Sequence, residues 1–205
     1  MKPYRLLFLT IAIVATSFNY PSSGLTEAER KYASNLLEET RKNLINKVSR
    51  LTPEQLNFKA DPGSWSVAEC VEHIAISENN IFGFAQMGLK EGADPSKRSE
   101  VKMTDEAIVR MITDRSNKVK TQEAFLPTGK FGSFEATLDE FKKKRDDNIR
   151  YINTTSDDLR NHYNDFPFGK TDTYQTILFM AAHTKRHTDQ IAEVMSNSNF
   201  PKKRK

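Results

Sequence analysis

Residues 171–195 read TDTYQTILFMAAHTKRHTDQIAEVM, and this stretch decides the fold class of the chain. One set of side chains recurs along it at intervals of three and four residues, which places the set on one face of an α-helix. The set is Ile177, Met180, Thr184, His187, Ile191 and Val194. The pattern predicts a long amphipathic helix that buries one face against other helices.

Upstream segments carry the same helical periodicity. They lie at about residues 26–48, 66–89, 104–119 and 133–152. Two of them begin with a capping box, Thr26–Glu29 and Ser66–Glu69, in which each side chain can bond the backbone N–H of the other residue. Thr104 and Ser133 are the expected N-caps of the other two segments. Each segment is therefore predicted to be a helix with a defined start.

The connections between these helices complete the prediction of the fold class. Residues 90–103 are polar and predict a long crossover connection, whereas residues 165–170 predict a turn. Eight glycines and eight prolines are too few for an ordinary all-β protein, and no stretch shows useful strand alternation. A length of 205 residues suits one domain. We expect an all-α bundle with short turns and one long crossover.

The start of the chain has the pattern of an export signal. Lys2 and Arg5 precede the apolar run LLFLTIAIVATSF at residues 6–18. A basic start and a short apolar run are typical of a signal peptide, and the run is shorter than the roughly 20 residues that span a bilayer. An uncleaved anchor or a buried first helix is the alternative. We expect a signal peptide at 1–24, which implies a periplasmic or extracellular chain with no stable membrane span after cleavage.

The remaining chain divides into a helical bundle at residues 25–196 and a loose basic tail at 197–205. Six of the 31 basic residues lie at the two ends, which leaves 25 against 27 acidic residues in the body. The basic run at 142–145 is flanked by acidic residues and predicts a solvated helix face. The charge distribution therefore argues against a nucleic-acid partner. Whether the chain forms a homodimer stays open.

Three histidines form a candidate metal site. His183 and His187 are four residues apart, so they lie one helical turn apart on one side of the last helix. His73 lies beside Ile74 on the inward stripe of the predicted helix 66–89. Three neutral imidazoles with open positions make a catalytic type of metal site. The alternative is a set of core histidines held by hydrogen bonds.

Two motifs around these histidines resemble those of the DinB/YfiT superfamily. WSVAECVEHI at residues 65–74 resembles its WSxxExxxHI segment, and HTKRHTDQI at 183–191 resembles its closing HxxRHxxQI segment. LTPEQL at 51–56 is similar to the linker before the first motif. The order and spacing of all three agree over roughly residues 30–200.

The resemblance implies a four-helix bundle of up-down-down-up topology that holds a divalent metal, zinc or nickel before others, on His73, His183 and His187. It also implies a metal-dependent hydrolase or transferase that acts on an unidentified small molecule. Some members use low-molecular-weight thiols, which are mainly cytosolic, so an export signal disfavours that chemistry here. Two alternatives stay open: a non-catalytic metal- or ligand-binding bundle, and a structural bundle whose histidines only pack.

Five neighbouring residues have competing interpretations. Glu69 is expected to act in its capping box, with a contact to a histidine as the alternative. Gln190 either orients a histidine or serves helix packing. Arg186 is expected to pair with an acid on a neighbouring helix. Cys70 is expected to be a buried apolar group rather than a ligand or nucleophile, and His162 is expected to be exposed.

We predict that the mature chain begins at Leu25, because small residues follow the apolar run and can present a cleavage site. N-terminal sequencing of the protein isolated from its native host checks this. A soluble cytosolic protein with an intact Met1 would contradict it.

Overall fold

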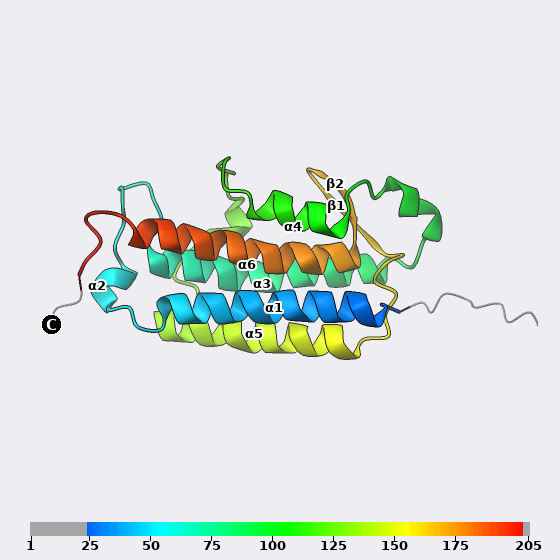
Figure 1. Cartoon of the computed structure of the whole chain (residues 1–205), viewed down its shortest axis with the longest axis horizontal. Helices are drawn as coiled ribbons and strands as arrows, with labels where there is room; N and C mark the ends of the chain where they lie inside the picture. Colours follow the sequence, from blue (N-terminus) through cyan, green and yellow to red (C-terminus); the bar gives the residue numbers. More distant parts are fainter. Residues whose placement is uncertain (1–23, 203–205) are drawn as a thin grey trace, which may run out of the picture.

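The computed structural model describes residues 24–202, so the predicted signal segment, apart from Gly24, and the last three residues of the basic tail lie outside the described residues. Four long helices pack side by side, as Figure 1 shows. Along the chain, the first and last of them run in one direction and the other two in the opposite direction, which is the predicted up-down-down-up arrangement. They are α1 (Glu27–Val48), α3 (Val67–Lys90), α5 (Phe134–Thr154) and α6 (Thr173–Met195).

The predicted helix starts are confirmed. Thr26 and Ser66 each accept a hydrogen bond from the backbone N–H three residues on, and both capping boxes are complete. Ser133 caps α5 in the same way, through the N–H of Ala136. The last helix begins two residues later than expected because Asp172 is its cap and accepts from the N–H of Gln175 at 2.7 Å.

The crossover between α3 and α5 is longer than predicted. It contains the 3₁₀ turn η1 (Pro95–Glu100), the short helix α4 (Asp105–Thr113) and the 3₁₀ turn η2 (Glu123–Phe125). The expected helix 104–119 starts at its predicted cap but ends at Thr113, because Asp114 adopts extended backbone and its side chain accepts from the N–H of Ser116. Helix α4 packs against α6 (Figure 1).

The turn predicted within 165–170 is present at residues 167–168, but the strands on either side of it were not predicted. Two four-residue strands, β1 (Tyr163–Phe166) and β2 (Gly169–Asp172), form an antiparallel hairpin there. Each strand is too short to show a hydrophobic alternation. The hairpin rests on α3 at Gly88, where a Cβ would lie 2.8 Å from both the backbone oxygen of Tyr163 and the side chain of Asn164. Only glycine allows this close approach.

Apolar side chains fill the bundle along its whole length. One cluster includes Leu37, Ile81, Ile152 and Leu178, and a second includes Leu44, Val71, Ile74, Phe141 and Ile191. The short helix α2 (Pro53–Leu56) adds Leu56 to the second cluster. No helix among residues 24–202 is long and apolar enough to cross a membrane.

A buried ion pair joins the four bundle helices at one point. Arg145 on α5 is completely buried, and its guanidinium holds Glu78 on α3 through two hydrogen bonds of 2.7 Å. The same group donates to the Leu37 carbonyl and the Thr40 hydroxyl on α1 and to the Thr184 hydroxyl on α6. The expectation that residues 142–145 are all solvated is therefore wrong for Arg145.

We predict that Arg145→Ala lowers the free energy of unfolding by about 3–5 kcal/mol, because it leaves the Glu78 carboxylate buried without its partner. Urea denaturation followed by circular dichroism measures this. Arg150→Ala is the matched control on the same helix, since its side chain is 69% exposed and pairs only with Asp147. The control should change stability by less than about 0.5 kcal/mol. Equal effects of the two substitutions would contradict the importance of the buried pair.

Candidate metal centre

The structure brings the three predicted histidines together between α3 and α6. Their Nε2 atoms form a nearly equilateral triangle, with edges of 3.1 Å (His73–His187), 3.2 Å (His183–His187) and 3.3 Å (His73–His183). Among the described residues, these three form a cluster whose ligand atoms all lie within 4.8 Å of one another. The helical spacing of His183 and His187 accounts for one edge, and the antiparallel packing of α3 on α6 accounts for the other two.

The outer nitrogens of two of these rings are held by hydrogen bonds. The Nδ1 atom of His73 lies 2.7 Å from the carbonyl oxygen of Phe125 in η2, and the Nδ1 atom of His187 lies 2.8 Å from the Gln190 Oε1 atom. A carbonyl oxygen only accepts, so His73 must donate through Nδ1, and its Nε2 atom then carries a lone pair when the ring is neutral. Gln190 thus contacts a histidine, as one of its two interpretations expected.

The electrostatics of the cluster suit a bound cation. Burial lowers the pKa of all three rings: that of His73 falls below its ordinary value, that of His187 falls to about 3, and that of His183 falls well below its ordinary value. Neighbouring histidines lower the pKa values of His183 and His187 further. The rings are therefore neutral at pH 7. Neutral rings with Nδ1–H on His73 and His187 leave two lone pairs facing each other at 3.1 Å with no hydrogen between them. A cation between them relieves this repulsion.

The size of the triangle also fits a metal. With metal–nitrogen bonds of about 2.0–2.1 Å, two imidazole ligands lie about 2.8–3.0 Å apart in an octahedral site and about 3.3–3.4 Å apart in a tetrahedral one. The observed edges of 3.1–3.3 Å fall between these values. The donor set of three neutral imidazoles suits zinc, nickel, copper or iron.

The three histidines differ in exposure, and His183 is the least buried of them. His73 is 2% exposed and His187 9% exposed, whereas His183 is half-buried. The Trp65 ring packs against His73 and His187, with ring centroids 4.8 and 6.2 Å apart. The Phe179 ring stacks on His183 at 5.9 Å. Of the three rings, His183 is thus the one that keeps the most exposed surface.

The acidic residues next to His73 are engaged elsewhere. Glu69 completes its capping box with Ser66 and pairs with Lys59 at 2.7 Å, which agrees with its expected capping role. Glu72 is buried and accepts from three successive backbone N–H groups, those of residues 128–130 in the loop after η2. Neither carboxylate is placed as a ligand or a base.

Two of the predicted roles of neighbouring residues are wrong. Arg186 pairs with no acid among residues 24–202: its guanidinium donates to the backbone carbonyls of Ile112, Asp114 and Asn117 and so fixes the crossover onto α6. His162 is half-buried rather than exposed, because its Nδ1 atom bonds the Asp158 carbonyl at 2.7 Å. The Phe125 carbonyl was missed from the sequence, since a backbone group in a non-periodic segment has no sequence signature.

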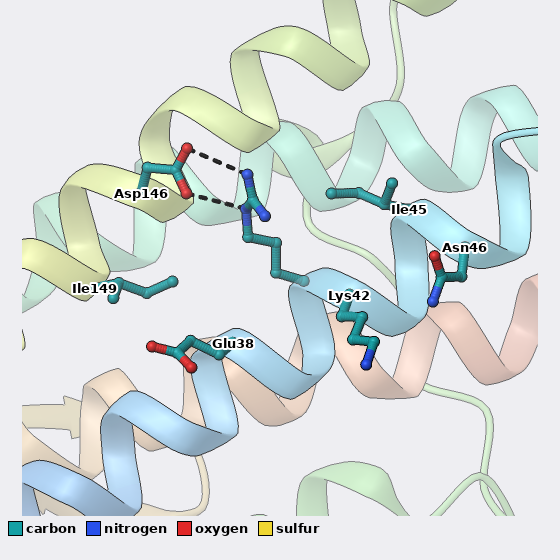
Figure 2. Close-up of a pocket in the computed structure, with 7 residues that line it drawn as sticks. Glu38, Lys42, Ile45, Asn46, Asp146 and Ile149 are labelled. Atoms are coloured by element: carbon teal, nitrogen blue, oxygen red, sulfur yellow. Dashed lines mark hydrogen bonds and ion pairs between the residues drawn. The ribbon is translucent and has the colours of Figure 1, made fainter.

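A surface hollow between α1 and α5 does not involve the histidines. Figure 2 shows Glu38, Lys42, Ile45 and Asn46 on one of its walls and Asp146 on the other. An ion pair between Arg41 and Asp146 of 3.0 Å crosses it, as the dashed lines in Figure 2 mark. Its lining comes from α1 and α5 alone, whereas the histidines lie on α3 and α6.

Comparisons with known proteins agree with this description. The family model of the DinB superfamily matches residues 36–191. Among solved structures, the chain is similar to YfiT from Bacillus subtilis, described as a probable metal-dependent hydrolase with an unusual four-helix bundle topology. The two share 15% sequence identity with a TM-score of 0.59, over 88% of this chain and 94% of the other. No curated protein matches the chain significantly.

Cys70 behaves as the sequence predicted: it is completely buried, and burial raises the pKa of its thiol to about 12.

We predict that iodoacetamide at pH 8 leaves the folded protein unlabelled, because the reactive thiolate of Cys70 is scarcely populated. The same reagent should label the urea-unfolded chain, whose thiol has a pKa of about 8.5. Mass spectrometry measures both. Cys70→Ala should bind as much metal as the wild type; rapid labelling of the folded protein, or loss of metal in this variant, would contradict the buried-thiol interpretation.

Proposed function

The chain belongs to the DinB superfamily, and from that premise we propose that it is an exported protein that binds a divalent metal on His73, His183 and His187 and acts on a small molecule by hydrolysis or group transfer. Zinc and nickel are the first metals to test. The observation that carries the proposal is the convergence of three Nε2 atoms within 3.3 Å of one another in a neutral, buried cluster.

A divalent ion held by these residues would supply Lewis acidity and lower the pKa of water toward 7. The residues of the chain itself would set its surroundings. Phe125 and Gln190 hold two imidazoles with Nε2 turned inward, and partners of this kind commonly change metal affinity 10–100-fold. Trp65 covers the cluster on one side, so that water and substrate reach it from the side of His183.

Hydrolysis is the first reaction class to test. It needs water and no cytosolic cosubstrate, so it is compatible with the export that the N-terminal sequence predicts. The description of YfiT as a probable metal-dependent hydrolase supports the same class. Thiol transfer needs a cosubstrate that is mainly cytosolic and ranks below it.

One observation favours a non-catalytic metal-binding protein as the second candidate. The two carboxylates nearest in sequence to His73, those of Glu69 and Glu72, are already bonded to other groups and are not free to act as a general base. Turnover of a panel of ester, amide and phosphoester substrates, with and without chelator, distinguishes the two candidates. Chelator-sensitive turnover supports the enzyme, and its absence across the panel supports the binding protein.

We predict that zinc or nickel raises the melting temperature of the apo protein, because the unfolded chain lacks the assembled site. At a metal concentration a hundredfold above the dissociation constant, the gain is roughly 2.7 kcal/mol, or about 5–10 °C for a chain of this size. Differential scanning calorimetry with and without chelator measures it.

Variants of the histidines test which residues cause the rise in melting temperature on addition of metal. Substitution of His73, His183 or His187 by Ala should remove most of the shift, whereas His162→Ala is the matched control and should keep it. The four bundle helices should still form in each variant, since their apolar stripes do not depend on the ion. An equal response to metal from the wild type and His73→Ala would refute the three-histidine site.

A further inference from the structure

A row of aromatic rings leads away from His183, the least buried histidine of the cluster. The Phe179 ring on α6 stacks on His183, and Phe166 and Phe168 of the hairpin lie 5.0 and 5.9 Å from Phe179. Phe166 and Phe168 stack on each other at 5.0 Å, and Phe84 on α3 meets Phe166 edge-on at 5.2 Å. We call these four phenylalanines the aromatic row. They continue the seam between α3 and α6 on which the histidines lie.

The aromatic row is not needed to attach the hairpin. Polar contacts already do this: Asn164 donates to the Phe84 carbonyl at 2.8 Å and accepts from Thr176 at 3.1 Å, and the buried Asp172 caps α6. The close approach at Gly88 adds to them. All four phenylalanines remain partly exposed. The hairpin is thus fixed by polar contacts, and it holds its two partly exposed rings against Phe179.

A buried hydroxyl lies at the junction between the histidines and the aromatic row. Ser77 is four residues after His73 and seven before Phe84, so the three share one face of α3. It is 1% exposed, and its Oγ atom makes no hydrogen bond to any residue in the described part of the chain. Buried polar atoms normally have a partner, but this hydroxyl is covered in the structure and offers no contact to a ligand, so the proposal below does not depend on it.

We propose that the aromatic row binds a flat apolar group of the substrate, while the reacting polar end of that substrate lies at the three histidines. The proposal rests on the metal site of the proposed function and names the substrate class that it accepts: a small molecule with an aromatic or similarly flat apolar group beside a polar, metal-binding group. Ring faces favour such groups through apolar burial and offset stacking.

Two hydroxamates with the same metal-binding end test this. Acetohydroxamate carries a methyl group, and benzohydroxamate carries a phenyl ring that can reach the aromatic row. Isothermal titration calorimetry on the zinc-loaded protein should find benzohydroxamate about tenfold tighter, as expected for partial burial of one phenyl ring. Phe179→Leu and Phe168→Leu keep apolar volume and should reduce this ratio to about two. Phe168→Tyr keeps the ring and should retain the ratio.

The control is Phe82→Leu, since Phe82 lies on α3, as Phe84 does, but its ring pairs with Tyr151 and not with the aromatic row. It should keep the tenfold ratio. If neither zinc nor nickel binds, the proposed function itself fails; if only nickel binds, the same titrations are made on the nickel-loaded protein. If zinc and acetohydroxamate bind but the two hydroxamates bind equally, or if the ratio survives both leucine substitutions, the aromatic row is not a substrate-binding surface, and the metal site stands without it.

Discussion

The buried guanidinium of Arg145 constrains the positions of all four bundle helices. It bonds Glu78 on α3, Thr40 on α1 and Thr184 on α6, and each of these partners is itself buried. An apolar interface can slide by part of a turn at modest cost, whereas a slide here would leave a buried charge or donor unpaired. Thr184 is the neighbour of His183, and Glu78 lies little more than one turn beyond His73. The contact that fixes the axial position of α3 against α6 therefore also fixes the histidine triangle.

Periodicity and local signals predicted the helices well, because caps and apolar stripes are properties of short segments. The four-residue spacing of His183 and His187, together with the position of His73 beside the inward stripe of α3, predicted which three rings meet. Arg145 was misassigned because it was taken with its basic neighbours. Its position on the helix indicates burial. One set of α5 residues recurs at intervals of three and four, and every member is buried: Leu138, Phe141, Arg145, Asn148 and Ile152. A charged residue inside an apolar stripe indicates a buried pair, even where its neighbours in sequence are solvated.

The rest of the site could not be predicted, because it depends on segments without periodicity. The Phe125 carbonyl reaches His73 only through the path of the crossover, which Arg186 holds through three backbone carbonyls. The hairpin is too short to show alternation, and its position follows from the absence of a side chain at Gly88 and from the amide of Asn164. These are contacts between residues that lie about 50 to 80 positions apart in sequence, and no local pattern encodes them.

The asymmetry of the cluster limits what its chemistry can be. Phe125 and Gln190 fix the rings of His73 and His187, Trp65 covers both, and their burial keeps them neutral. Imidazole lone pairs are costly to bury without a partner, and a cation that accepts all three of them would be that partner. A structural metal site would close a fourth side with another protein ligand, and the described residues bring only three ligands together. The least buried of the three rings, His183, stacks on Phe179, so the proposed reactant would meet that aromatic side chain next to the histidines.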